Sequence, residues 1–250
     1  CGVSIVGALP WENHDGGALP VLPLASLFAG WEARRATLDV NSEIATIPDL
    51  SGNGNVLTSV AAAGVGNRAT LVADPDYRNQ GVAVFSPAAA GKRIRRATFA
   101  QGALNEPFTL YFVHEQDDAG VRYNLDAGSG GQTEYMYFDG TVFRTRQDGI
   151  SEASVGATRT PVGRCIQMDG VTLRTYNNNF RAGAEVFNGV GSLAATTTGF
   201  TIGDIQGGGF PLLGRFCAAY LYSAYHDAGQ RAAVARYINF SFGGTFTILT

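Results

Sequence analysis

The chain has 250 residues, of which 45% are apolar and 16% charged, and its formal net charge at pH 7 is −3. This length and apolar content suffice for one sizeable all-β domain, while the charged fraction lies below that of a typical soluble domain. The near-neutral balance gives no overall attraction to nucleic acid, and the apolar runs are too short to span a bilayer. We therefore expect no nucleic-acid partner and no transmembrane segment.

Residues 1–27 differ in composition from the rest of the chain. They contain Pro10, Pro20 and Pro23 and repeat Gly-Ala-Leu-Pro at 7–10 and 17–20. Because proline disrupts central strand pairing, we expect an extended arm that precedes a β-sandwich domain at 28–250. The arm is apolar and must lie on its own domain or on a partner in an assembly. Cys1 fits either a lipidated cysteine or a processed start.

From residue 28 onward, short β patterns alternate with turn signals. Asp139-Gly140, Asp169-Gly170 and Asn188-Gly189 are dipeptides typical of hairpins. Many short strands with such spacing predict a sandwich or barrel. The strands are expected at 28–32, 36–40, 56–60, 70–73, 82–86, 94–100, 107–114, 121–126, 133–138, 141–146, 152–158, 164–168, 171–176, 184–187, 199–203 and 214–223.

The sequence Asp-Leu-Ser-Gly-Asn-Gly-Asn at 49–55 is the most distinctive local motif. Asp, Ser and Asn side chains hydrogen-bond nearby backbone, and glycine permits positive φ, so the motif predicts a rigid turn. It also matches the opening of an EF-hand-type calcium loop, but the twelfth position is Val60 instead of a bidentate glutamate. We predict no cofactor, with calcium kept open.

One short C-terminal helix is expected at 228–238, with Asp227 as its N-cap residue. Val234 and Ile238 lie four residues apart and form a narrow apolar stripe. Cys165 and Cys217 lie in strand-like runs and are interpreted as buried, reduced thiols. The alternative is a disulfide bond between the two cysteines across paired strands.

Several motifs occur together in an order that points to a family. They are Trp31, the turn at 49–55, Val-Ala-Val-Phe at 82–85, the strand at 108–113, Met-Asp-Gly at 168–170, Tyr-Asn-Asn at 176–178, Ile-Gly at 202–203, and the strand and helix at 216–238. Over about residues 28–242 the chain resembles the concanavalin A-like, laminin-G-like jelly-roll superfamily. The resemblance implies two curved antiparallel sheets, with carbohydrate binding or adhesion as the commonest role.

Two loops carry the amide, carboxylate and aromatic groups that sugar binding uses. The candidate ligand-binding residues are Tyr176, Asn177, Asn178, Asn179, Arg181 and Asp204. A plain hairpin tip is the alternative for the first loop, since asparagine tolerates left-handed backbone. The basic run at 92–96 is interpreted either as a solvated strand edge or as a contact surface for an anionic polymer or an acidic neighbouring subunit.

No catalytic motif is visible. The resemblance brings glycosidases into question, and among them the laminarinase-type enzymes carry a Glu-x-Asp-x-x-Glu strand. Glycoside hydrolysis needs two carboxylates facing the scissile bond, and no such spacing occurs here. His14, His114 and His226 lie apart from any nucleophile motif. The sequence therefore predicts that the chain is not an enzyme and that it has no catalytic or metal-binding residues.

Together these features predict a non-catalytic binding or attachment module for a glycan or surface polymer. We expect it outside the cell, displayed on a cell surface or on a virion as a decoration or fibre protein. The arm would contact neighbouring subunits or join a homo-oligomer. The alternatives are a purely structural packing module of an assembly, and a glycosidase or lyase acting on polysaccharide.

Overall fold

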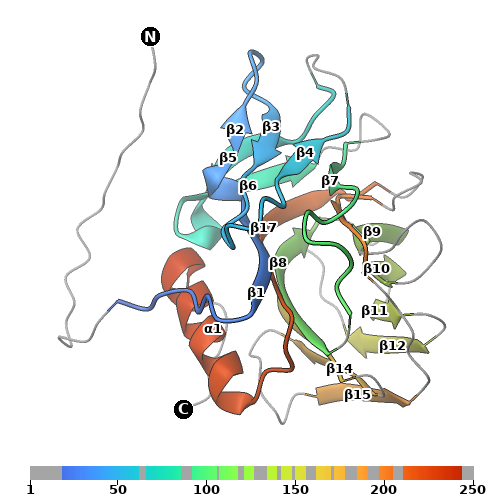
Figure 1. The fold of residues 1–250 in the computed structure, drawn as a ribbon. Helices are drawn as coiled ribbons and strands as arrows, with labels where there is room; N and C mark the ends of the chain where they lie inside the picture. The colour runs from blue at the N-terminus through green and yellow to red at the C-terminus, as the bar shows by residue number, and fades with distance from the viewer. Residues whose placement is uncertain are drawn as a thin grey trace.

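The computed structural model describes residues 19–61, 66–85, 92–105, 107–117, 121–126, 134–139, 142–147, 150–155, 162–169, 172–177, 185–190, 197–204 and 211–243. They form two antiparallel sheets that face each other, and one helix on the outer side of the first sheet (Figure 1). The predicted all-β two-sheet sandwich with a single C-terminal helix is confirmed.

The first sheet, sheet A, contains the longest strands. Its order is β15 (Glu185–Val190), β14 (Thr172–Asn177), β13 (Val162–Met168), β8 (Phe108–Gln116), β17 (Gly214–Tyr222), β6 (Gln80–Phe85) and β5 (Thr70–Asp74). β1 (Leu27–Glu32) pairs with the second half of β17. Two 3-10 turns, η1 (Ala33–Arg35) and η2 (Pro75–Tyr77), follow β1 and β5.

The second sheet, sheet B, is built from shorter strands. Its order is β12 (Ile150–Val155), β11 (Val142–Gln147), β10 (Glu134–Asp139), β9 (Val121–Asp126), β16 (Phe200–Ile202), β7 (Ile94–Arg96), β4 (Leu57–Ser59), β3 (Ile44–Ile47) and β2 (Thr37–Leu38). The sequence missed β3 because its buried residues, Ile44 and Ile47, are three apart and break the period of two.

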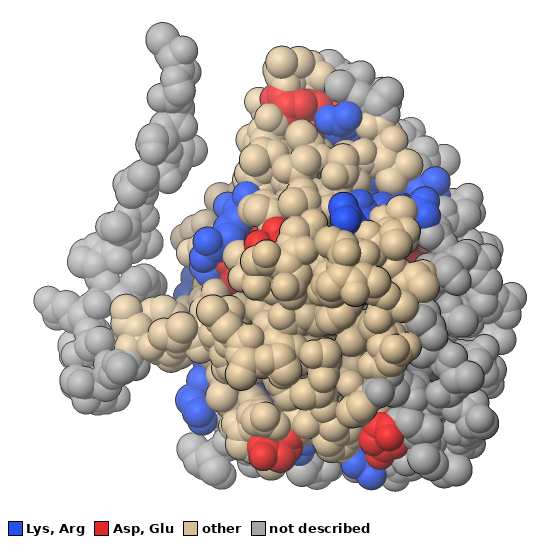
Figure 2. Space-filling model, in the orientation of Figure 1, with Lys and Arg blue, Asp and Glu red and all other residues tan. Residues whose placement is uncertain are grey.

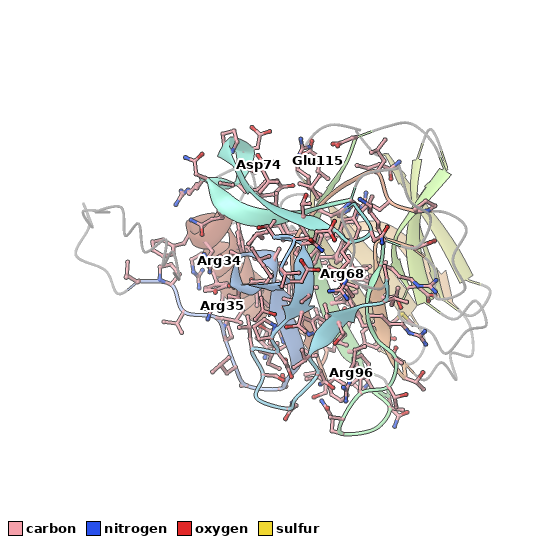
Figure 3. All side chains as sticks on the ribbon, turned by 90° about the horizontal axis from the view of Figure 1, so that it is seen from above. Arg34, Arg35, Arg68, Asp74, Arg96 and Glu115 are labelled. Carbon is pink, nitrogen blue, oxygen red and sulfur yellow. The ribbon has the colours of Figure 1, made fainter. Side chains whose placement is uncertain are left out.

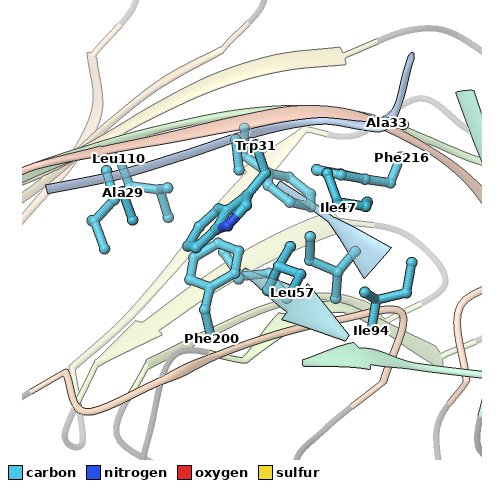
Figure 4. Packing of buried hydrophobic residues seen from close by; sticks show 14 of the residues in the cluster. Ala29, Trp31, Ala33, Ile47, Leu57, Ile94, Leu110, Phe200 and Phe216 are labelled. Carbon is cyan, nitrogen blue, oxygen red and sulfur yellow. The ribbon is translucent and has the colours of Figure 1, made fainter. Parts of the chain in front are cut away.

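The main hydrophobic core fills the space between the sheets (Figure 4). Trp31 is fully buried, and its ring lies 4.7 Å from that of Phe200 of the opposite sheet. Its indole Nε1 donates a hydrogen bond to the Asn55 carbonyl oxygen, at 2.5 Å. Trp31 thus joins the two sheets and also fixes the turn that follows β3.

A second core lies between the outer face of sheet A and α1 (Ala228–Phe242). The predicted N-cap is confirmed: Asp227 accepts from the Gln230 amide, and the Gln230 side chain accepts from the Asp227 amide. The helix runs four residues past Ile238 because Phe242 is also fully buried in this core. Cys165 and Cys217 are buried free thiols, as expected.

Only the last part of the predicted arm falls within the described residues. Leu22 is 7% exposed and packs into the core beneath α1, and the Pro23 carbonyl oxygen accepts a hydrogen bond from the Tyr222 hydroxyl at 2.9 Å. Leu19, Val21 and Leu24 remain exposed. Residues 1–18 lie outside the described part of the chain. Within the described part, no helix has the length and apolarity required to cross a membrane.

Candidate functional site

The motif at 49–55 forms the rigid turn that the sequence predicts. Asp49 Oδ1 accepts from the amides of Gly30 and Ser51, both at 3.0 Å, and Oδ2 accepts from the Asn55 amide at 2.9 Å and the Ser51 hydroxyl at 2.7 Å. Gly52 and Gly54 have φ values of 82° and 77°, which glycine tolerates best. Both carboxylate oxygens therefore serve the turn itself.

The amide side chains of this turn are also occupied by the protein. The Nδ2 atoms of Asn53 and Asn55 donate to the Phe28 carbonyl oxygen at 3.0 and 3.2 Å, and Gln101 Nε2 donates to the same oxygen at 2.8 Å. Asn55 Oδ1 accepts from the Ala100 amide at 2.8 Å. The motif thus ties the start of β1 to the turn and to the loop after β7.

The structure places the predicted ligand residues in different settings. Tyr176 is 3% exposed under α1, and the Arg231 guanidinium lies 4.6 Å above its ring. Asp204 is fully buried just after β16. Asn177 is the last residue of β14. Asn178, Asn179 and Arg181 lie outside the described residues. Their roles in binding stay predictions, but the described contacts give Tyr176 a packing role.

A row of polar residues crosses the outer face of sheet B, and no local sequence pattern predicts it. Strand register aligns Thr37 with Thr46, Thr46 with Thr58, Thr58 with Arg95, Arg95 with Thr201, and Thr201 with Asp126. The neighbours of these residues along each strand, such as Ile47, Leu57, Ile94 and Ile202, point into the core. We call Thr37, Thr46, Thr58, Arg95, Thr201 and Asp126 the polar row.

The polar row spans six adjacent strands, or about 24 Å at the usual spacing between strands. Thr37 and Thr58 are exposed, Thr46 and Arg95 are partly buried, and Thr201 and Asp126 are buried. The hydroxyls of Thr37 and Thr46 lie 2.6 Å apart, which confirms that neighbours in the row share a face. The row therefore presents hydroxyl groups and one cation beside each other, open to solvent at the β2 end.

The basic run at 92–96 does not form a strand edge, so that interpretation is wrong. β7 pairs with β16 on one side and with β4 on the other, which places it inside sheet B. Ile94 enters the core, Lys92 is 5% exposed, and Arg95 points to the outer face. Basic side chains appear in blue near β7 in Figure 2, and Figure 3 shows Arg96 away from Asp74 and Glu115.

Three carboxylates from two separate segments of the chain meet around Arg215 at the start of β17. Its Nε lies 2.8 Å from Asp74 Oδ2, and its Nη1 lies 2.7 Å from both Glu115 Oε1 and Asp117 Oδ1. Glu115 is 3% exposed, and its Oε2 has no hydrogen-bond partner among the described residues. Burial raises the pKa of Glu115 to about 7, since the neighbouring carboxylates offset much of the attraction of Arg215.

This raised pKa makes stability depend on pH. The folded chain keeps a proton on Glu115 that the unfolded chain releases above about 4.5, so this group's contribution to stability is lost as pH rises toward 7. His226 acts in the opposite direction: burial lowers its pKa to about 4, and its contribution is lost as pH falls below 6.5. The two effects partly cancel in the dependence of the wild-type unfolding free energy on pH.

A Glu115→Gln variant separates them. The unfolding free energy of the variant minus that of the wild type is expected to rise by about 3 kcal/mol between pH 4.5 and 8, because the shift of Glu115 disappears. Urea unfolding at closely spaced pH values measures this difference. Arg236→Gln, an exposed change on α1, should show no such trend. A difference that stays constant with pH would show that Glu115 titrates normally.

The two described histidines have structural surroundings. His114 is fully buried between the sheets, with its ring 5.0 Å from Phe112, and burial holds its pKa well below the usual value. His226 Nδ1 lies 2.8 Å from the Tyr111 hydroxyl beneath α1. His14 lies outside the described residues.

No family model and no curated protein matches this chain. Among solved structures, an arabinofuranosidase complexed with arabinofuranosyl-alpha-1,2-xylobiose matches with a TM-score of 0.61 and 14% identity, over 80% of this chain and 52% of that one. Domain 4 of AbnA, a GH43 extracellular arabinanase from Geobacillus stearothermophilus, in complex with arabinotriose, also matches. Its TM-score is 0.55 at 12% identity, over 87% of this chain and 98% of that one.

A third match is the ligand-binding domain of botulinum neurotoxin serotype D in complex with N-acetylneuraminic acid. Its TM-score is 0.57 at 9% identity, over 86% of this chain and 50% of that one. This chain therefore spans about half the length of the arabinofuranosidase and of the neurotoxin domain, and nearly all of the AbnA domain. At these identities the matches show the fold: a two-sheet β-sandwich of a kind that occurs in glycan-binding and glycosidase proteins.

These matches correct one prediction. The sequence lacks the Glu-x-Asp-x-x-Glu strand, and on that ground we expected a chain that is not an enzyme. An arabinofuranosidase shares the fold without sequence similarity, so the absence of one family's motif does not argue against hydrolysis. Carboxylates can also converge from distant segments, as Asp74, Glu115 and Asp117 do around Arg215. The prediction that the chain is not an enzyme is withdrawn.

Proposed function

We propose that this chain is a carbohydrate-binding β-sandwich and that the outer face of sheet B is its binding face. The observation that carries the proposal is the polar row. Hydroxyl groups both donate and accept hydrogen bonds, and arginine supplies five donors in a fixed plane. Because these groups stand on paired strands, binding a saccharide would require little ordering of the protein.

The other broad face of the sandwich is less suited to this role. α1 covers part of the outer face of sheet A, and its contacts there are occupied: Tyr111, Cys165, Tyr220 and Val234 are all fully buried. The AbnA domain complexed with arabinotriose supports a saccharide ligand, because nearly its whole length has the same fold. The neurotoxin domain with N-acetylneuraminic acid adds a second sandwich of this kind.

A glycan array followed by calorimetry tests the proposal. We expect the full chain to bind at least one oligosaccharide class with a dissociation constant between about 1 μM and 1 mM, or about −8 to −4 kcal/mol. The same samples should be assayed for release of reducing sugars, which determines whether binding is accompanied by hydrolysis. If the correctly folded protein binds no glycan on arrays of neutral and acidic saccharides, carbohydrate binding is refuted.

We further propose that the module belongs to the concanavalin A-like, laminin-G-like superfamily and acts outside the cell, on a cell or virion surface. Residues 1–27 would join it to a homo-oligomer or to neighbouring subunits. The exposed Leu19, Val21 and Leu24 support this role for the arm. Sedimentation analysis of the full chain and of a chain that lacks residues 1–21 and carries Leu24→Ser tests it, because this variant removes all three exposed side chains but keeps the buried Leu22 and its neighbour Pro23. Identical oligomeric states would exclude it.

A further inference from the structure

Arg95 occupies an unusual position for an arginine. It lies on the outer face of β7, in the interior of sheet B, with Thr58 beside it on one strand and Thr201 on the other. Its side chain is partly buried, and its Nε atom is shielded from solvent. Because β7 pairs with β4 and with β16, the backbone at Arg95 is held by strands on both sides. Its guanidinium therefore projects from a rigid support.

The guanidinium of Arg95 has no hydrogen-bond or ion-pair partner among the described residues. Three other partly buried arginines are paired: Arg34 with Glu32, Arg68 with Asp39, and Arg215 with three carboxylates. Arg96, the next residue along β7, shares the feature of Arg95, because its Nε is also shielded and has no partner among the described residues. A shielded donor without an acceptor costs free energy, and native proteins rarely leave one without a functional or solvent partner. The position therefore favours a ligand that brings an acceptor.

The surroundings of Arg95 restrict the chemistry of this ligand. A planar guanidinium matches a carboxylate through two parallel hydrogen bonds. The exposed or partly buried hydroxyls of Thr58 and Thr46 lie beyond it and suit the hydroxyl groups of a sugar ring. Densely charged polymers fit less well, because the row also holds Asp126 and the whole chain is net negative.

From this geometry we infer that the polar row binds an acidic glycan, with Arg95 holding the carboxylate of a uronic or sialic acid unit and Thr58 and Thr46 contacting neighbouring hydroxyls. This inference rests on the proposed carbohydrate binding and narrows it to a substrate class. It assigns the anionic group to Arg95, in the middle of the row, and the neutral part of the glycan to the exposed threonines toward β2.

Calorimetry with matched saccharides tests the inference. Trigalacturonate, its methyl ester, sialyllactose, lactose and arabinotriose are the probes. The wild type should bind at least one acidic member at least tenfold more tightly than its uncharged counterpart. Arg95→Gln should abolish that tenfold preference, Arg95→Lys should retain part of it, and Thr58→Val should weaken both members of the pair. Arg236→Gln, which removes an unpaired charge from α1, is the matched control.

Each result has a defined meaning. If uncharged saccharides bind equally well and Arg95→Gln changes nothing, the acidic-glycan inference is overturned while carbohydrate binding stands. If no saccharide binds, the proposed function itself fails. If dextran sulfate or single-stranded DNA binds as tightly as the acidic sugar and depends equally on Arg95, the site is a general polyanion site and the inference is wrong. Thermal melting of every variant confirms that the chain is folded.

Discussion

Replacing Glu32 by glutamine is expected to lower the free energy of unfolding by about 3–5 kcal/mol. Glu32 is fully buried at the end of β1. Its Oε2 accepts from Arg34 and Arg35 Nε at 2.8 and 3.0 Å, and its Oε1 accepts from the hydroxyls of Tyr220 and Tyr237 at 2.8 and 2.6 Å. One carboxylate therefore links β1, η1, β17 and α1.

The glutamine variant would place an amide donor against these donors and leave the Arg34 charge without its counter-charge. Burial alone would raise the pKa of Glu32, but the charge of Arg34 and the tyrosine hydroxyls outweigh it and lower the pKa. This contribution is present above the usual glutamate pKa of about 4.5 and is lost as pH falls further. The penalty of the variant should therefore shrink in acid.

Urea unfolding at neutral pH and at about pH 3 measures both effects. Arg35→Gln is the control, because the Arg35 side chain is 53% exposed and a surface pair contributes about 1 kcal/mol at most. A loss below about 1 kcal/mol for Glu32→Gln would mean that this network does not hold α1 on the sheet.

Replacing Asp49 by alanine is expected to cost about 3 kcal/mol. The change removes the acceptor of three backbone amides and one hydroxyl, and hydrogen bonds to a charged group are among the stronger ones. Asn53→Ala, which removes an exposed side chain from the same turn, should cost about 1 kcal/mol. Chemical unfolding of the two variants and the wild type provides the comparison.

The same protein tests whether the turn binds calcium. Because both Asp49 oxygens already accept hydrogen bonds from the chain, adding calcium or a chelator should leave the melting temperature unchanged. A rise in melting temperature with calcium that disappears in Asp49→Ala would show instead that the turn rearranges into a metal site.

Local patterns were sufficient for most of the fold. Alternation predicted β9 at its observed bounds, and Asp227 marked the start of α1 because the capping residues are adjacent in sequence. The turn at 49–55 was predictable for the same reason. β3 was not, since Ile44 and Ile47 break the alternation.

The candidate site depends on information that a sequence does not display. Thr46, Thr58, Arg95, Thr201 and Asp126 become neighbours only through the register of strands that are far apart in the chain. Residue types alone favoured loops with aromatic and amide side chains, and on that ground Tyr176 and Asp204 were predicted to bind a ligand. The structure buries both side chains. Composition can mark a sugar-binding type of side chain, but burial decides whether that side chain is accessible.

Methyl NMR of threonine-labelled protein shows directly whether a saccharide binds on the outer face of sheet B. On titration with the tightest-binding saccharide, the methyl signals of Thr46 and Thr58 should shift, whereas those of Thr109, which is buried beside α1, should not. With an acidic saccharide at a sub-saturating concentration, the shifts should be smaller in Arg95→Gln than in the wild type. Saccharide binding that leaves Thr46 and Thr58 unchanged would contradict the assignment of the binding face to sheet B.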